Sequence, residues 1–298
     1  MWKKILAVLV GLVIGYWLYD DFDPETLNAK RVVITGASTG IGEQIAYHYA
    51  RFGAKILITA RREEVLKQVV DRCRQVGSTE GQYEYITADM SDMSATQNVI
   101  REATRRLGGI DILVLNHITV MPLGEWKGTP QNLSSLQHIF DVNFRAYVHL
   151  TSHAFSELEK TSGSVIVVSS FAGKVSIPFV APYSASKFAL DGFFSALRQE
   201  LRMKNCDISI TLCIIGLVGT DNALSKLMEF RQDFLLSVMK PATPTDTALA
   251  IVKGGQRRVR EIYYPYLDVR IPYLLRDWLP NAIESVTRYI STPSHYKR

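Results

Sequence analysis

The sequence predicts an α/β fold: a Rossmann-type, doubly wound parallel sheet of about seven strands with helices on both faces, preceded by an N-terminal apolar segment. Short apolar runs alternate with helical stretches, and a glycine-rich turn follows the first run. The runs are continuously apolar, which is typical of strands buried on both faces. With 298 residues, 47% hydrophobic and 21% charged, the chain has enough apolar surface for a large core, which excludes a disordered protein.

The first twenty residues stand apart from this pattern. Lys3 and Lys4 precede a mostly apolar, uncharged run from Ile5 to Tyr19. The run is short for a spanning helix, but it is apolar on every face and ends in aromatic residues, as membrane anchors do. We expect residues 1–20 to be an uncleaved signal anchor; the alternative is a cleaved signal and a secreted protein. The lysines favour the cytosolic side, which would place residues 21–298 in the lumen.

The first half of the body alternates strands with helices. The strands are short runs rich in β-branched and aromatic residues, and the helices carry apolar residues three or four apart. We expect strands over Arg31–Thr35, Lys55–Thr59 and Tyr83–Thr87, and helices over Gln44–Phe52, Glu63–Val76 and Ala95–Leu107.

The second half continues the alternation with longer helices. We expect strands over Ile110–Leu115, Val165–Ser169 and Ile208–Ile214, a seventh over Ile262–Tyr264, and helices over Leu133–Leu158 and Ser184–Met203. The region Leu224–Leu236 also has apolar residues at helical spacing. Because no linker or composition break divides the body, residues 21–298 are expected to form a single domain.

The turn after the first strand predicts a phosphate site. Residues 35–42 read Thr-Gly-Ala-Ser-Thr-Gly-Ile-Gly and open a helix. The glycines let the backbone approach a pyrophosphate, and the helix N-terminus supplies free N–H groups. We expect a dinucleotide to contact Gly36, Ser38, Thr39, Gly40, Ile41 and Gly42.

The end of the second strand predicts the type of cofactor. Arg61 and Arg62 stand where NAD-binding proteins have an acidic residue for the ribose hydroxyl, so NADP(H) is favoured. The alternative is that both arginines cap the strand in solvent. Further cofactor contacts are expected at the ends of the third and fourth strands, from Asp89, Met90, Asn116, His117 and Ile118. His117 is expected to be a packed residue rather than a base.

Ser170, Tyr183 and Lys187 form the candidate chemical group. Tyr183 and Lys187 are four residues apart, so they share one face of a helix. Ser170 ends the fifth strand, and the following loop can return the chain to it. This Tyr-x-x-x-Lys with an upstream Ser resembles the short-chain dehydrogenase/reductase family. The Thr-Gly-x-x-x-Gly-x-Gly turn, Asn116 and Asn143 match the family in order and spacing over about residues 29–265.

The resemblance implies an NADP-dependent oxidoreductase that acts on CH–OH donors. Tyr183 would exchange a proton with the substrate oxygen, and Ser170 would orient that oxygen. The Lys187 ammonium and the oxidised nicotinamide should lower the tyrosine pKa from about 10. Lys187 would also hold the nicotinamide ribose, and Asn143 a water of the proton relay. Val218 and Thr220 would contact the nicotinamide.

Three further segments are similar to the 11β-hydroxysteroid dehydrogenase group of this family, both type 1 and type-1-like. They are residues 116–119, 183–194 and 209–213. The group implies a homodimeric NADP(H) enzyme of steroid and lipid metabolism, on the endoplasmic reticulum membrane, that interconverts 11-hydroxy and 11-keto glucocorticoids such as cortisol and cortisone. Thr39 replaces a Lys of type 1 enzymes, and Ile177 replaces a Tyr. An apolar substrate wall is expected from Ser170, Phe171, Ile177, Val180, Ile215, Leu217 and Leu227, although these are also ordinary core positions.

Other functions remain open in the sequence. The substrate could instead be retinol, another steroid position or a xenobiotic carbonyl. A non-catalytic NADP-binding module would lack Tyr183 or Lys187, and both are present. There is no Cys/His cluster that marks a metal site and no long basic run for nucleic acid. Asn132 begins a glycosylation sequon. The basic, aromatic tail Gln256–Arg298 is expected to be a dimer and membrane-facing surface, or else a solvated tail.

Overall fold

The computed structural model describes residue 2 and residues 21–79, 81–119, 123–230 and 233–293. Apart from Trp2, the expected anchor over residues 1–20 lies outside this described part. Within it, no helix is both long enough and apolar enough to cross a bilayer.

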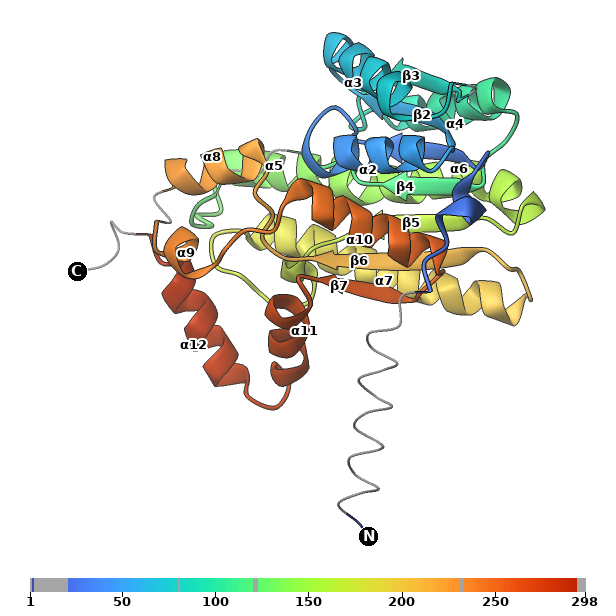
Figure 1. The fold of residues 1–298 in the computed structure, drawn as a ribbon. Helices are drawn as coiled ribbons and strands as arrows, with labels where there is room; N and C mark the ends of the chain where they lie inside the picture. Colours follow the sequence, from blue (N-terminus) through green and yellow to red (C-terminus); the bar gives the residue numbers. More distant parts are fainter. Residues whose placement is uncertain (1, 3–20, 80, 120–122, 231–232, 294–298) are drawn as a thin grey trace.

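The described strands form one seven-stranded sheet in the order β3-β2-β1-β4-β5-β6-β7, and each neighbouring pair is parallel (Figure 1). This confirms the predicted doubly wound sheet. Strand order reverses between β1 and β4, and ligands of such sheets bind beside the carboxyl ends of the strands at this reversal. The strands are β1 (Arg31–Thr35), β2 (Lys55–Ala60), β3 (Tyr83–Thr87), β4 (Ile112–Leu115), β5 (Ser164–Val168), β6 (Ser209–Ile215) and β7 (Glu261–Tyr264).

Helices cover both faces of the sheet. One face carries η1 (Pro24–Leu27), α2 (Gly40–Arg51), α3 (Glu63–Val76) and α10 (Pro244–Gln256). The other carries α4 (Met93–Leu107), α6 (Ala146–Lys160) and α7 (Ala181–Met203). In Figure 1, α8 (Asp221–Glu229) and α9 (Asp233–Val238) lie to the left of the sheet, with α11 (Tyr266–Leu275) and α12 (Pro280–Ser291) below it.

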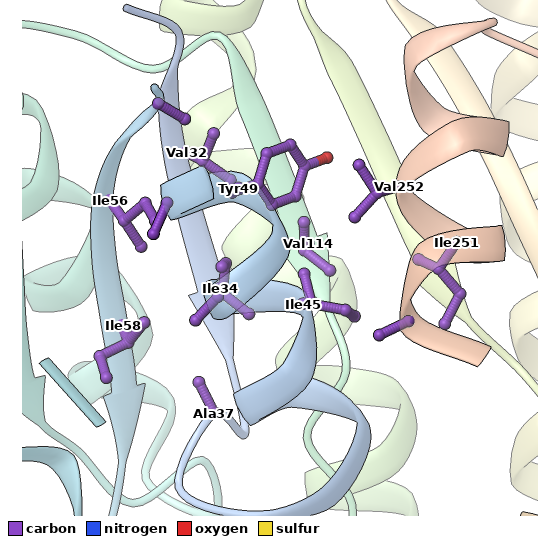
Figure 2. Close-up of a cluster of buried hydrophobic side chains, with 14 of the residues drawn as sticks. Val32, Ile34, Ala37, Ile45, Tyr49, Ile56, Ile58, Val114, Ile251 and Val252 are labelled. Carbon is purple, nitrogen blue, oxygen red and sulfur yellow. The ribbon is translucent and has the colours of Figure 1, made fainter. Parts of the chain in front are cut away.

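The five inner strands are buried on both faces, as their continuous apolar sequences require, whereas the edge strands β3 and β7 are only partly buried. Val32 and Ile34 of β1 pack in the cluster beneath α2 and α10, whereas Val33 packs in the opposite cluster. Figure 2 shows the first cluster, in which Tyr49 of α2 and Val252 of α10 pack above the strands. The two cores hold the carboxyl ends of the strands in register, and the site is built on those ends.

The predicted helix Leu133–Leu158 is interrupted. It consists of α5 (Pro130–Phe140), a π-helical turn η2 (Asp141–Arg145) and α6. A π turn is a single turn inserted in an α-helix, and the apolar spacing on either side of it is still helical, so the pattern predicted one continuous helix. The turn carries Asn143, and π turns occur frequently at functional sites.

The C-terminal tail folds into helices. After α10 it forms β7 and then α11 and α12, and the expected segment Leu224–Leu236 is divided between α8 and α9. Large apolar side chains of α11, α12 and the turn between them are exposed, namely Leu267, Ile271, Leu274, Trp278, Leu279, Val286 and Tyr289.

Candidate active site

A cavity of about 560 Å³ opens at the carboxyl ends of the strands, around the reversal between β1 and β4. The β1–α2 turn contributes Gly36, Ser38, Thr39, Gly40 and Ile41 to its wall. The ends of β2, β3 and β4 contribute Arg61, Arg62, Asp89, Met90, Asn116, His117 and Ile118. Tyr183, Leu217, Thr220 and Leu227 complete the predicted residues in the wall. The fold therefore brings residues from across the chain to one site.

The β1–α2 turn lies tightly against the end of β4. Gly36 has a positive φ of 65°, and a Cβ atom there would lie 2.6 Å from the His117 Cα, so a side chain does not fit. The Asn116 side chain donates hydrogen bonds to the carbonyl oxygens of Thr35 (3.3 Å) and Gly36 (3.1 Å). This backbone cradle, followed by the N-terminus of α2, fits a pyrophosphate.

The two arginines lie on the same wall as the turn. The Arg62 guanidinium donates to the hydroxyls of Ser38 (3.1 Å) and Thr39 (3.5 Å). Hydrogen bonds from Ser91, together with the nearby charge of Arg61, lower the pKa of Asp89 despite partial burial. The buried Thr59 hydroxyl, also in the wall, has no hydrogen-bond partner among the described residues. An anionic ribose phosphate fits this group of donors.

Tyr183 and Ser170 meet at the end of β5. Ser170 caps the short helix η3 (Phe171–Gly173), where its Oγ accepts a hydrogen bond from the Ala172 N–H at 3.2 Å. Tyr183 lies in the first turn of α7 and lines the cavity. Burial raises the pKa of Tyr183, and its hydrogen bond to Ser170 opposes that rise. The expected lowering is therefore not found in the protein alone, because removing the phenolate from water outweighs its stabilisation.

Lys187 lies one turn further along α7, behind Tyr183. Its Nζ donates to the Val168 carbonyl at 2.9 Å and lies 5.7 Å from the Tyr183 ring centroid. The Tyr147 ring centroid is 5.4 Å from the same Nζ. Burial lowers the pKa of Lys187 to about 7. Near pH 7, a small change in the surroundings of the Nζ would therefore shift the balance between the charged and the neutral amine.

Asn143 is fully buried in the π turn. Its Oδ1 accepts a hydrogen bond from the Thr119 N–H at 2.9 Å, which joins the turn to the segment after β4. Its Nδ2 has no partner among the described residues. A buried amide donor of this kind is a group to which an ordered water binds.

His117 is a packed residue, as expected, although it also lines the cavity. Its Nδ1 lies 2.8 Å from the Thr35 Oγ1 and its Nε2 lies 3.0 Å from the Val142 carbonyl. Because a carbonyl only accepts, Nε2 carries the proton. Burial and the charge of Lys187 lower the pKa of His117 to about 3, so the ring is neutral.

Several predicted residues lie outside the cavity wall. Gly42 belongs to α2, Lys187 lies behind Tyr183, and Val218 forms a bridge with Ala242. Ile215 belongs to the core cluster beneath α2 and α10. Its position in the core follows from the alternation of side chains along β6. Ser170, Phe171, Ile177 and Val180 precede Tyr183 in the chain and are also absent from the wall.

The cavity wall also includes residues that the sequence motifs miss. His138 comes from α5, while Asn222 and Lys226 come from α8. Thr220 caps α8 by accepting a hydrogen bond from the Ala223 N–H at 3.3 Å. A Thr before an apolar helical run is a cap signal, so the start of α8 was detectable. The sequence did not show that side chains of α8 face the cavity.

A family profile described as "short chain dehydrogenase" matches residues 30–229. Two "Hydroxysteroid 11-beta-dehydrogenase 1-like" proteins are each 48% identical. The Xenopus tropicalis protein aligns over 93% of both chains and the Gallus gallus protein over 86% of both.

Two solved structures share the fold at low sequence identity. An alcohol dehydrogenase from Thermococcus sibiricus, complexed with 5-hydroxy-NADP, gives a TM-score of 0.66 at 23% identity and covers 78% of this chain and 95% of its own. A short chain dehydrogenase/reductase from Burkholderia phymatum, in complex with NAD, gives a TM-score of 0.73 at 20% identity. It covers 86% of this chain and 95% of its own.

Proposed function

The chain belongs to the short-chain dehydrogenase family, and we propose that it is an NADP(H)-dependent oxidoreductase that interconverts a hydroxyl group and a ketone on a steroid. The 11-position of glucocorticoids, as in cortisol and cortisone, is the first candidate. One observation carries the proposal: the Tyr183 phenol faces a cavity that also holds the phosphate-type turn, with Ser170 bonded to it and Lys187 behind it.

The proton chemistry falls to Tyr183. Burial raises the pKa of its phenol, so in the protein alone it is protonated at neutral pH. A protonated phenol is the form that donates a proton to a ketone oxygen, which suits the direction of reduction. Ser170 would hydrogen-bond the same oxygen and orient it. The bound cofactor supplies or accepts the hydride.

Lys187 adjusts the acidity of Tyr183. Its ammonium lies 5.7 Å from the phenol ring, so its charge stabilises the phenolate when Tyr183 has given up its proton. With the lysine pKa lowered to about 7, any hydrogen-bond acceptor that reaches the Nζ would restore its charge. A ribose hydroxyl is such an acceptor.

The preference for NADP(H) over NAD(H) is argued from Arg61 and Arg62. Both line the cavity, and the partners of Arg62 are the neutral hydroxyls of Ser38 and Thr39. Charge-assisted hydrogen bonds to a phosphate are stronger than bonds to neutral groups. A 2′-phosphate would therefore replace the hydroxyls as the better partner of this guanidinium.

A steroid substrate is argued from the relatives' names and from the apolar part of the wall. Leu123, Leu217 and Leu227 lie in the cavity with Tyr183. The test is turnover of paired alcohols and ketones with NADPH, NADP, NADH and NAD, with Tyr183→Phe as the blank. Fastest turnover of cortisone or cortisol supports the 11-position. Preference for retinol, another steroid position or a xenobiotic carbonyl would support those alternatives. NADPH binding without any turnover would support a non-catalytic module.

Location and assembly are further proposals. The apolar run Ile5–Tyr19 and the exposed apolar side chains of α11 and α12 support attachment to the endoplasmic reticulum membrane, with the catalytic domain in the lumen. Secretion after signal cleavage is the alternative, and a homodimer is expected. Protease protection in intact microsomes tests whether the catalytic domain lies in the lumen, and so does endoglycosidase sensitivity at Asn132. The mass of the detergent-extracted protein tests the homodimer.

A further inference from the structure

A buried ion-pair cluster lies outside the cavity wall, centred on Lys174. The Lys174 side chain is 5% exposed, and its Nζ lies 2.7 Å from the Asp191 Oδ1 and 3.2 Å from the Glu261 Oε1. Asp191 belongs to α7 and Glu261 to β7. One ammonium therefore joins two elements that are distant in sequence. The two carboxylates offset the cost of burying the Lys174 ammonium.

The short helix η3 connects Lys174 to Ser170. The Gly173 N–H donates to the Ser170 carbonyl at 2.8 Å, and the Lys174 N–H donates to the Phe171 carbonyl at 2.9 Å. Gly173 packs on the backbone of Lys187, where an added Cβ would lie 2.9 Å from the lysine carbonyl carbon. Helix η3 therefore packs directly against α7, the helix that carries Tyr183. The ion pairs of Lys174 hold the C-terminal end of η3 in place.

The C-terminal segment closes over the same lysine. The Tyr273 ring centroid lies 5.1 Å from the Lys174 Nζ, and the Arg276 guanidinium donates to the Lys174 carbonyl. Glu261 also accepts a hydrogen bond from the Tyr263 hydroxyl. The carboxylates, the tyrosines and the arginine leave Lys174 little freedom to move.

We propose that Lys174 is a positioning residue: its ion pairs to Asp191 and Glu261 fix η3, and through η3 they fix the Ser170 hydroxyl beside Tyr183. The expected change in kcat rests on the proposed oxidoreductase function, whereas the fixed position of η3 does not. Lys174 is outside the cavity wall, so its loss should lower kcat and leave the affinity for NADPH nearly unchanged. A misplacement of about 1 Å at a reacting group can lower the rate by about 100-fold.

The test compares Lys174→Met and Lys174→Arg with Arg31→Met. Arg31 forms an ion pair of similar length with Asp111, at 2.8 Å, at the opposite end of the strands. We expect Lys174→Met to lower kcat by about 10- to 100-fold, with the Kd for NADPH within twofold of wild type. Lys174→Arg, which keeps the charge, should recover most of the loss. Arg31→Met should lower stability and leave kcat unchanged.

Equal kcat in Lys174→Met and Arg31→Met would overturn the proposal, since Lys174 would then contribute stability alone. If Lys174→Met does not fold, Glu261→Gln tests the same anchor with one charge removed. Hydrogen exchange of residues 170–176 gives a readout without turnover. It should rise in Lys174→Met but not in Arg31→Met, even if the wild-type protein reduces no carbonyl in the panel. Unchanged exchange there would reject the positioning role, and a missing wild-type activity would reject the proposed function instead.

Discussion

The imidazole of His117 is fixed between Thr35 and Val142, with its Nδ1 2.8 Å from the Thr35 Oγ1. The pair joins the end of β1 to the end of β4, where strand order reverses. The buried, neutral imidazole of His117 therefore holds part of the cavity wall in place, and acid would protonate and charge this ring.

Acid should therefore destabilise the protein through His117. Its pKa is about 3 in the folded state, against about 6.5 when unfolded. Between these values the unfolded chain binds the extra proton, so the free energy of unfolding falls as the pH falls from 6.5 towards 3. The slope is at most about 1.4 kcal/mol per pH unit. Urea unfolding of wild type and His117→Gln over pH 4–7 measures it. An equal slope in both proteins would contradict the assignment.

Lys187 should have the corresponding effect on the alkaline side. Its folded pKa is about 7 against about 10.4 when unfolded, so the unfolded chain binds more protons between these values. The free energy of unfolding should rise with pH from 7 to 9, by up to about 1.4 kcal/mol per pH unit. Lys187→Met should remove this dependence while abolishing turnover. Denaturant titrations of the cofactor-free proteins at pH 7, 8 and 9 provide the comparison.

Tyr183→Phe should abolish turnover and keep NADPH binding nearly intact. Only the phenolic hydroxyl that faces the cavity is removed, while the ring stays in its place. Steady-state rates and NADPH fluorescence titration separate the two effects. A Phe variant that turned over within a few-fold of wild type would show that another group moves the proton.

Replacing Arg61 and Arg62 together by Ala should weaken NADPH binding far more than NADH binding. Hydrogen bonds to a charged phosphate contribute about 1.5–3 kcal/mol each, so the Kd for NADPH should rise by about tenfold or more. The Kd for NADH serves as the internal control. A similar loss for both cofactors would mean that the arginines hold something other than the 2′-phosphate.

The sheet was predictable because its inner strands are buried on both faces. A continuous run such as Ser-Ile-Thr-Leu-Cys-Ile-Ile at β6 leaves few other structures open. The π turn at Asn143 was not predictable, because the segments on either side of it are both helical and their apolar spacing predicts one continuous helix. Helices α11 and α12 were missed for a different reason: a tail rich in aromatic and basic residues was interpreted by composition rather than by its caps.

The site was predictable where a motif fixes local geometry. The turn after β1 brings most of its residues to the cavity, the Tyr-x-x-x-Lys helix brings Tyr183, and Arg61 and Arg62 follow from the end of β2. His138, Asn222 and Lys226 reach the same cavity only through the packing of α5 and α8. Ile215 shows the opposite error, since a position beside a motif turned out to face the core.

The contacts around Lys174 also set an order of events in biosynthesis. Ser170, Tyr183 and Lys187 leave the ribosome well before Glu261, Tyr273 and Arg276, which surround Lys174. A nascent chain can therefore expose every residue of the Tyr-x-x-x-Lys chemistry while the anchor of its serine loop is still being synthesised. Full activity should be reached only after Arg276 has been synthesised, and a premature stop codon that removes Glu261, Tyr273 and Arg276 should lower kcat in a protein whose catalytic residues are all present.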